Sequence, residues 1–354
     1  MAAVRPYRFV RYAVPSPDQA APPYDVLTQA ERDALAARHP HSVLLLTLAA
    51  TPEEGGRTFR RWLDDGTLVR DDEPSAWLLE QEVTLPDGVA AIRRGLVASL
   101  LAEPYEHGVV LRHEHTHRAP VEGRLQLLRA ADAQVEPLFF VYEGALALDR
   151  PARPADLAGA GTSLWRLAGV DVAALFAERQ LLIADGHHRY EATLALSRER
   201  AAPLRVMALL VASEDPGLSA LATHRLYTGR IPELDGESLP DGVDPVAALA
   251  AEPAGRAATV LVTAAGARLV RGGAGELDVQ LVDRVGRDGI SYTASANDAL
   301  ARVRSGEADA ALFVRPVSVS DVFERARRDE VLPPKTTFFA PKALSGFLFH
   351  PFAP

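Results

Sequence analysis

The chain has 354 residues, 48% of them hydrophobic and 24% charged, a composition typical of a folded globular protein of about two domains. The 38 Lys and Arg residues against 47 Asp and Glu residues give a net charge of −9, the wrong sign for holding nucleic acid by counterion release. The absence of cysteine excludes disulfides, thiolate metal sites and a cysteine nucleophile. No apolar run of about 18 residues could cross a bilayer, and the first residues lack a signal-peptide core, so we expect a cytoplasmic protein without membrane or nucleic-acid partners.

The first part of the chain mixes helix and strand signals. Thr28 is expected to cap a helix with Glu31 as its capping-box partner, and the apolar residues 44–46 suit a buried strand. The elements expected next are strands at 76–83 and 95–101, a helix at 122–133 and a strand at 138–142. A segment rich in Pro, Ala and Asp at 148–162 is the best linker candidate.

The later part of the chain continues this alternation. A strand at 179–184 runs directly into a turn and a helix that ends near Arg200. The elements expected after it are strands at 206–212, 258–263 and 310–314 and helices at 278–285 and 297–305. We therefore predict an α+β fold with mixed sheets and flanking helices, built from an N-terminal region, residues 1–147, and a C-terminal region, residues 163–354, that both contribute to one site.

The turn Asp185-Gly186-His187-His188-Arg189 carries the strongest local signal. Its strand passes through a glycine into a helix, whose N-terminus offers backbone N–H groups and a positive dipole end to an anion. Arg189 can bind phosphate or carboxylate, and the histidines can donate or transfer protons. Asp185 can cap the helix or bind Mg²⁺. The alternative interpretation is a capped helix with surface histidines.

Three histidines alternate in the segment 112–118. In a strand, His113, His115 and His117 would share one face, with Glu114 and Thr116 on the other. Three imidazoles could hold zinc or another transition metal, although their spacing lacks the His-Glu-x-x-His pattern of metalloproteases. The other interpretations are a polar segment that brings Glu114 and Thr116 to a substrate, and a solvated edge.

Lysine is scarce in this chain, because Lys335 and Lys342 are the only two among its 38 basic residues. Arginine cannot replace lysine where a compact ammonium must fit against a phosphate or a carbonyl, so this pair points to a binding role, with chance as the alternative. Thr223-His224-Arg225 forms another basic cluster. The sequence contains no P-loop, no Gly-x-Ser-x-Gly elbow and no Gly-x-Gly-x-x-Gly fingerprint, and so gives no support to a P-loop enzyme, a serine hydrolase or a Rossmann oxidoreductase.

Taken together, five ordered motifs resemble the family called domain of unknown function 1015, over nearly the whole chain. The motifs are Pro22-Pro23-Tyr24-Asp25-Val26, Arg112-His113-Glu114-x-Thr116, Asp185-Gly186-His187-His188-Arg189-Tyr190-Glu191, Thr223-His224-Arg225 and Pro333-Pro334-Lys335-Thr336-Thr337-x-Phe339-x-Pro341-Lys342.

The Asp-Gly-His-His-Arg core is also similar to the phosphate-binding signature of the ParB/sulfiredoxin-like superfamily, which includes free-serine kinases. This resemblance implies a nucleotide-binding core in which the turn holds the phosphates of ATP or ADP, with Asp185 and Mg²⁺ nearby. It does not identify the carboxylate that deprotonates the acceptor hydroxyl, for which Asp25 and Glu114 are candidates. The predicted catalytic residues are Asp25, Glu114, Asp185 and His188, the predicted cofactor-binding residues are Gly186, His187, His188, Arg189, Arg225, Lys335 and Thr336, and the predicted substrate-binding residues are Tyr24, His113, Thr116, Glu191 and His224.

The leading hypothesis is a phosphotransferase that moves a phosphoryl group from ATP or ADP to a small hydroxylated metabolite, most plausibly L-serine, to give O-phosphoserine. Lys335 or Arg225 would neutralise the charge that develops on transfer. One alternative is a nucleotide-binding regulatory module without turnover. The other is a metal-dependent hydrolase or lyase that uses the three alternating histidines with His187 or His188.

Overall fold

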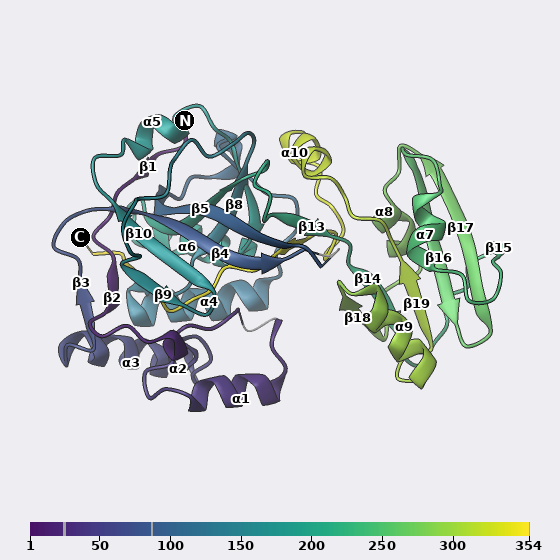
Figure 1. Ribbon diagram of the computed structural model, residues 1–354, viewed down its shortest axis with the longest axis horizontal. Coiled ribbons are helices and arrows are strands. Elements are labelled where there is room, and N and C mark those ends of the chain that lie inside the picture. The colour runs from purple at the N-terminus through teal and green to yellow at the C-terminus, as the bar shows by residue number, and fades with distance from the viewer. Residues whose placement is uncertain (24–25, 86–87, 354) are drawn as a thin grey trace. The chain divides into compact units, whose positions relative to one another are not determined.

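The computed structural model describes residues 1–23, 26–85 and 88–353, and Figure 1 labels its helices and strands. The chain forms two units, each discontinuous in sequence. Unit 1 comprises Met1–Arg112, Thr116–Ser219 and Pro341–Pro354, and unit 2 comprises His113–His115 and Ala220–Ala340. Both units combine helices with sheets, which confirms the predicted α+β class with mixed sheets and flanking helices.

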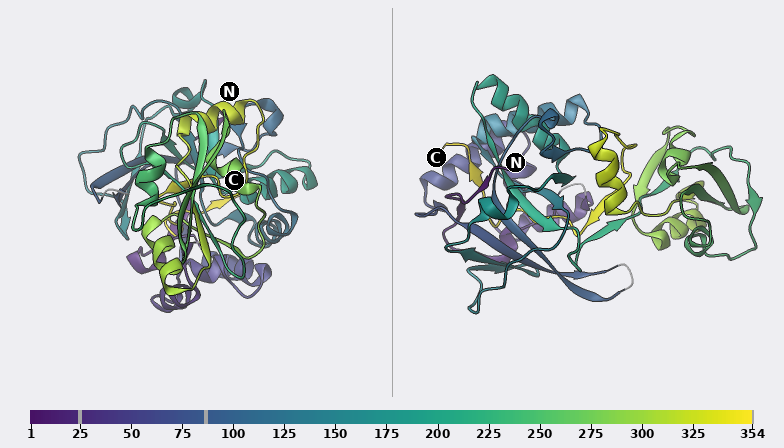
Figure 2. Two further views of the ribbon diagram at one scale, coloured as in Figure 1. Left: turned by 90° about the vertical axis from the view of Figure 1, so that its right-hand side faces the viewer. Right: turned by 90° about the horizontal axis from the view of Figure 1, so that it is seen from above.

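A nine-stranded mixed sheet forms the centre of unit 1. Its order is β6-β11-β8-β12-β5-β4-β10-β9, with β1 paired to β5, and β8 and β12 run parallel. The long strands β4 and β5 are antiparallel neighbours, drawn in blue side by side in the right-hand view of Figure 2. Every residue of β8 is buried, as in a strand that is covered on both faces. The strands are β1 (Val4–Arg5), β4 (Ala76–Thr84), β5 (Ala90–Leu101), β6 (Val110–Leu111), β8 (Leu138–Tyr142), β9 (Leu157–Gly159), β10 (Thr162–Leu167), β11 (Leu181–Asp185) and β12 (Arg205–Ala212).

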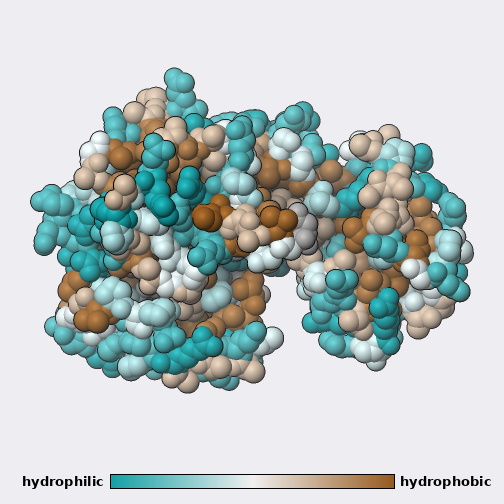
Figure 3. All heavy atoms as spheres, in the orientation of Figure 1, coloured by the Kyte–Doolittle hydropathy of each residue, from teal (hydrophilic) through white to brown (hydrophobic). Residues whose placement is uncertain are grey.

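Helices and two short strand pairs complete unit 1. Leu125 and Leu128 of α4 pack with Ala192 and Leu196 of α6 in one apolar cluster. By contrast, no residue of α1 is buried, and Figure 3 shows teal and pale brown residues mixed along the lower edge where this helix lies. The remaining elements are η1 (Pro17–Gln19), α1 (Gln29–Ala37), α2 (Leu44–Thr47), α3 (Pro52–Asp64), η3 (Tyr105–His107), α4 (Arg118–Ala131), α5 (Val172–Phe176), α6 (His187–Glu199), and the pairs β2 (Val10–Tyr12) with β3 (Leu68–Arg70) and β7 (Ala133–Gln134) with β21 (His350–Pro351).

An antiparallel six-stranded sheet forms the centre of unit 2, in the order β15-β17-β16-β19-β14-β18. Its apolar core includes Leu226, Val260 and Phe313, which are fully buried. The elements are β13 (Ser219–Leu221), β14 (His224–Tyr227), β15 (Glu237–Ser238), α7 (Pro245–Ala250), β16 (Arg256–Thr263), β17 (Gly266–Ala274), α8 (Asp278–Asp283), β18 (Ile290–Thr293), α9 (Ala296–Ser305), β19 (Ala310–Phe313), α10 (Val319–Arg327) and β20 (Phe338–Ala340), which pairs with β13.

Several local predictions can be compared directly with these elements. Thr28 caps α1 in a capping box with Glu31, as predicted. Residues 44–46 lie in the helix α2 and not in a strand, because a short apolar run fits either element, and Leu48 N–H closes a helical turn on the Leu44 carbonyl at 2.9 Å.

The predicted division of the chain at residues 148–162 also differs from the structure. That segment contains β9 and the start of β10, and β10 pairs with β4 in the sheet of unit 1. Unit 1 instead continues to Ser219 and also includes the C-terminal segment from Pro341. The reason is that strands from the predicted N-terminal region and from the predicted C-terminal region lie in one sheet. None of the helices in the described part of the chain is long and apolar enough to span a membrane.

Candidate functional site

The predicted turn lies in unit 1, where β11 ends at Asp185 and α6 begins at His187. Gly186 has φ of +102°, a left-handed conformation that suits glycine, and a Cβ there would lie 3.2 Å from both the Arg189 guanidinium and the side chain of Leu138. Among the described residues, no side chain caps the N-terminus of α6. The local geometry therefore matches the predicted strand, glycine and helix N-terminus.

Two cations hold the carboxylate of Asp185. Arg189 Nη2 donates to Oδ2 at 2.5 Å, while the ammonium of Lys342 forms an ion pair with Oδ1. Arg189 also donates through Nη1 to the carbonyl oxygen of Pro137 at 2.6 Å. Both terminal nitrogens of the Arg189 guanidinium thus donate to acceptors within the protein.

Lys342 reaches the turn from the C-terminal segment of unit 1. The neighbouring carbonyl of Pro341 accepts a hydrogen bond from Arg93, which also donates to Gln81 Oε1. Arg93 is fully buried, stacks over the ring of Phe139 at 4.8 Å, and has its pKa lowered to about 10 by burial. The sheet therefore anchors the segment that carries Lys342.

A second interaction joins the turn to the segment before α4. The backbone N–H of His117 donates to Nε2 of His188 at 3.1 Å, and the two imidazoles stack with centroids 6.2 Å apart. His187 is buried, with 7% of its surface exposed. His188, predicted as a catalytic residue, therefore has a defined contact with the polar segment, whereas Thr116 lies partly exposed in the loop just before it.

The first turns of α6 also contact the protein interior. The hydroxyl of Tyr190 donates to the Glu103 carbonyl at 2.7 Å and accepts the Glu103 N–H at 2.9 Å, and burial raises its pKa. Glu191 hydrogen-bonds Tyr105, whose pKa is raised chiefly by burial. These contacts fix the start of α6, and they tie Glu191, a predicted substrate residue, to a tyrosine of the same unit.

Unit 2 brings together members of three other motifs. Glu114 Oε1 accepts the backbone N–H of Lys335 at 3.0 Å, and Arg225 Nη2 donates to the Lys335 carbonyl at 3.4 Å. Arg225 also donates to the carbonyl of Thr223, is only 3% exposed, and has its pKa lowered by burial. Arg225, a predicted cofactor-binding residue, is thus part of the interior of unit 2.

Three more predicted site residues are interior residues of unit 2. His113 Nε2 pairs with the hydroxyl of Thr337 at 2.8 Å, and the Thr336 hydroxyl donates to the Pro333 carbonyl at 2.6 Å. His224 accepts the Val314 N–H at 3.4 Å, and its pKa falls to about 4 through burial and the nearby charge of Arg225. These contacts, with the burial of all three side chains, place the three predicted residues in the interior of unit 2.

The structure does not support the metal-binding predictions. No three histidine or acidic side chains of the described residues are close enough together to hold a metal ion. Residues 112–118 do not form a strand, so the expected alternation of His113, His115 and His117 on one face is not present. Asp185, the predicted Mg²⁺ ligand, forms ion pairs with Arg189 and Lys342. Tyr24 and Asp25 lie outside the described residues.

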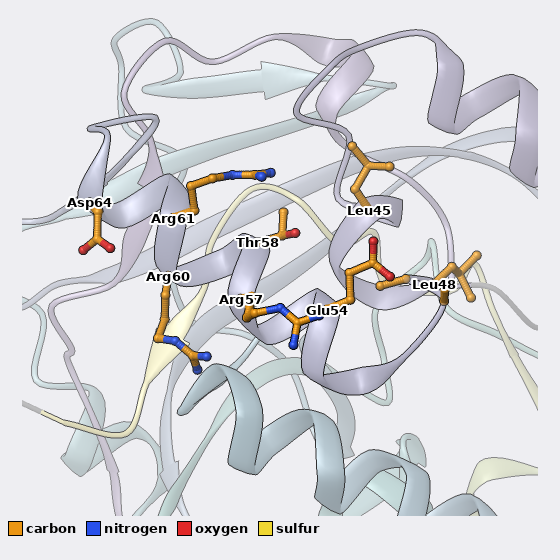
Figure 4. A pocket seen from close by; sticks show the side chains of 10 residues that line it. Leu45, Leu48, Glu54, Arg57, Thr58, Arg60, Arg61 and Asp64 are labelled. Atoms are coloured by element: carbon orange, nitrogen blue, oxygen red, sulfur yellow. The ribbon is translucent and has the colours of Figure 1, made fainter.

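A hollow in unit 1 lies elsewhere, between α2 and α3, with a volume of about 850 Å³ (Figure 4). Leu45 and Leu48 line it together with Arg57, Arg60 and Arg61. None of the residues that line it belongs to the five motifs. This hollow is therefore separate from the residues that the sequence singled out.

Two residues that support the turn at Gly186 were not predicted from the sequence. Lys342 was noted as a rare lysine but was not assigned to the site, although it forms an ion pair with Asp185. Arg93 carries no motif signal at all, and only the fold shows that it holds the Pro341 carbonyl. The scarcity of lysine was the available signal for Lys342, because both lysines lie in one motif.

Comparison with known proteins identifies the family. Residues 4–282 match the model described as protein of unknown function (DUF1015), and the chain belongs to this family. No curated protein matches the sequence. A solved conserved hypothetical protein from Pyrococcus furiosus is similar with a TM-score of 0.42 and 17% identity, over 69% of this chain and 90% of that one. A free serine kinase in complex with AMP is similar with a TM-score of 0.44 and 16% identity, over 71% of this chain and 91% of that one.

Proposed function

We propose that the protein is a nucleotide-dependent phosphotransferase that moves a phosphoryl group from ATP or ADP to a small hydroxylated metabolite, with free L-serine as the acceptor. The observation that carries this proposal is the junction of β11 and α6 at Gly186, where no side chain in the described residues caps the helix. The N-terminus of a helix binds phosphate through its backbone N–H groups and its dipole. The motif resemblance to the phosphate-binding turn of free-serine kinases supports the same ligand.

The charges around the turn favour an anion. Asp185 contributes one negative charge, and Lys342 and Arg189 contribute two positive charges in direct contact with it. The cluster therefore has an excess of positive charge next to the positive end of the α6 dipole. In this proposal Lys342 attracts the phosphates, while Arg189 and Asp185 hold the turn in shape.

The acceptor hydroxyl needs a carboxylate as general base. Of the two candidates, Glu114 is engaged with the backbone N–H of Lys335, so we assign the role to Asp25. His188 lies beside the turn and is the proposed proton donor to the phosphates. The nucleotide is proposed to carry Mg²⁺, which usually needs only one or two protein carboxylates beside the phosphates.

Phosphorus NMR tests the proposal. The purified protein is incubated with ATP or ADP, Mg²⁺ and a panel of hydroxylated metabolites headed by L-serine, and a new phosphomonoester resonance is expected. Gly186→Ala should abolish this resonance, because the new Cβ would meet Arg189 and Leu138. Gly169→Ala is the matched control, since Gly169 also has a positive φ, of +72°, but no atom within 4 Å of the added carbon. Intact nucleotide with every acceptor would refute the kinase, and binding without turnover would favour the regulatory module.

A further inference from the structure

The hollow between α2 and α3 combines cationic and apolar side chains. Arg57, Arg60 and Arg61 line it from α3. Leu45 of α2 and Leu48 at its C-cap lie to the right of these arginines in Figure 4. Leu45 is 38% exposed, which is unusual for a large apolar side chain between two packed helices. A molecule in the hollow would therefore find both charged donors and an apolar surface.

Two close backbone approaches fix the position of α3. A Cβ on Gly55 would lie 2.4 Å from the carbonyl oxygen of Leu46 in α2. A Cβ on Gly56 would lie equally close to the backbone of Ala130 in α4. Trp62, further along α3, is only 1% exposed. Since packed interiors of this kind deform little, the hollow is formed before any ligand binds.

The arginines of the hollow have no partners within the protein. None of the three guanidinium groups forms an ion pair or a hydrogen bond with another described residue. Glu53 precedes Arg57 by four positions on α3, a spacing and order that favour an ion pair. Asp283 and Arg287 do pair at this spacing, at 2.7 Å, whereas Glu53 and Arg57 do not. The donors that line the hollow are thus available to a ligand.

The charges in the hollow favour an anion. Arg57 precedes Arg60 and Arg61 by three and four positions, spacings at which like charges repel on a helix surface. Three positive charges face two negative ones, from Glu54 and Asp64, so the lining has a net positive charge. The volume of about 850 Å³ lies within the range of small-molecule sites, roughly 300–1,000 Å³. A small anion would fit this space and relieve the repulsion.

We propose that this hollow binds a small amphipathic anion, which has one oxyanion group and a short apolar chain. The three arginines bind the oxyanion, because guanidinium groups match carboxylate and phosphate oxygens in bidentate hydrogen bonds. Leu45 and Leu48 contact the apolar chain. The oxyanion is a carboxylate or a phosphate monoester, which share this chemistry. Such binding is independent of the proposed phosphotransfer, since no residue of the hollow belongs to the turn at Gly186.

The first test uses three probes with the same apolar chain. The full-length protein is titrated calorimetrically with hexanoate, hexyl phosphate and 1-hexanol, each separately. We expect an anion to bind at least about tenfold more tightly than the neutral alcohol, and the better anion identifies the oxyanion group. That anion should also raise the thermal midpoint. No binding of either anion, or equal affinity for the alcohol, would overturn the proposal.

The second test locates the bound anion. The double variant Arg57→Gln/Arg61→Gln should lose at least about tenfold in affinity for the better anion and still fold, because both side chains are exposed. Arg198→Gln/Arg304→Gln is the matched control, since it makes the same charge change at exposed helical arginines outside the hollow. The control should bind like the wild type. Equal affinity of the first variant and the wild type would overturn the proposal.

The third test separates this site from the turn and measures the apolar contact. Leu45→Ser should lower the preference for hexyl phosphate over methyl phosphate about fivefold, and an unchanged preference would refute the contact with Leu45. Gly186→Ala should leave the affinity for hexyl phosphate unchanged. If Gly186→Ala abolished binding and the double arginine variant did not, the anion would lie at the turn, which would overturn this proposal and leave the proposed phosphotransfer intact.

Discussion

The ion pair between Lys342 and Asp185 allows a quantitative prediction. The two side chains are 11% and 15% exposed, so water can replace the lost partner only in part. Removing a hydrogen bond to a charged group costs about 1.5–3 kcal/mol, and breaking a fully buried ion pair costs about 3–5 kcal/mol. Because Arg189 still bonds the other oxygen of Asp185, we expect Lys342→Met to destabilise unit 1 by about 1.5–3 kcal/mol.

A double-mutant cycle isolates the pair. Lys342→Met, Asp185→Asn and the double variant are unfolded in urea and followed by tryptophan fluorescence, which reports on unit 1 because Trp62, Trp77 and Trp165 all lie there. We expect a coupling free energy of about 1–3 kcal/mol between the two substitutions. The single variant Lys342→Met should also lower the thermal midpoint by roughly 3–10 °C.

The control is Lys335→Met, which removes the other lysine. Its ammonium forms no ion pair within the described residues, so the change in unfolding free energy should stay within about 0.5 kcal/mol. Additive effects of Lys342→Met and Asp185→Asn, within about 0.5 kcal/mol, would show that the two side chains do not stabilise each other, because independent sites show no coupling.

Three further predictions concern unit 1. Gly186→Ala should destabilise it by about 1–3 kcal/mol in urea unfolding, since φ there is +102°, and unchanged stability would contradict the backbone argument. Burial lowers the pKa of His350 from 6.5 to about 3, so the unfolded chain binds more protons between these values and stability should fall as pH drops from 6.5 towards 3. Urea unfolding at several pH values measures this loss, and His350→Gln should flatten it. Arg93→Met should lower the free energy of unfolding by about 1–3 kcal/mol, measured by thermal unfolding, because the acceptors on Gln81 and Pro341 lose their donor. A smaller effect would mean that water replaces the guanidinium as donor.

The sequence predicted local structure correctly where a residue type has one specific structural role. Thr28 and Glu31 specify a capping box by their spacing, and the structure contains it. The apolar run before Asp185 and the glycine after it likewise specified the strand and turn that lead into α6. In each of these patterns the interacting residues lie within a few positions of one another in the sequence.

Predictions that depend on distant partners were less successful. The sequence does not show that Arg225 is buried, because its partners are the carbonyl groups of Thr223 and of the distant Lys335. The two units could not be read from composition, since the pairing of β10 with β4 joins strands that are far apart in sequence. The ion pair of Lys342 with Asp185 spans most of the second half of the chain and leaves no local pattern.

In the proposed function, the turn at Gly186 binds nucleotide phosphates. Calorimetric titration of the wild-type protein with ADP and, separately, with adenosine measures this binding. We expect one ADP bound per chain, much weaker binding of adenosine, and loss of ADP binding in Gly186→Ala but not in Gly169→Ala. Equal affinity for ADP and adenosine, or no binding of ADP, would contradict it.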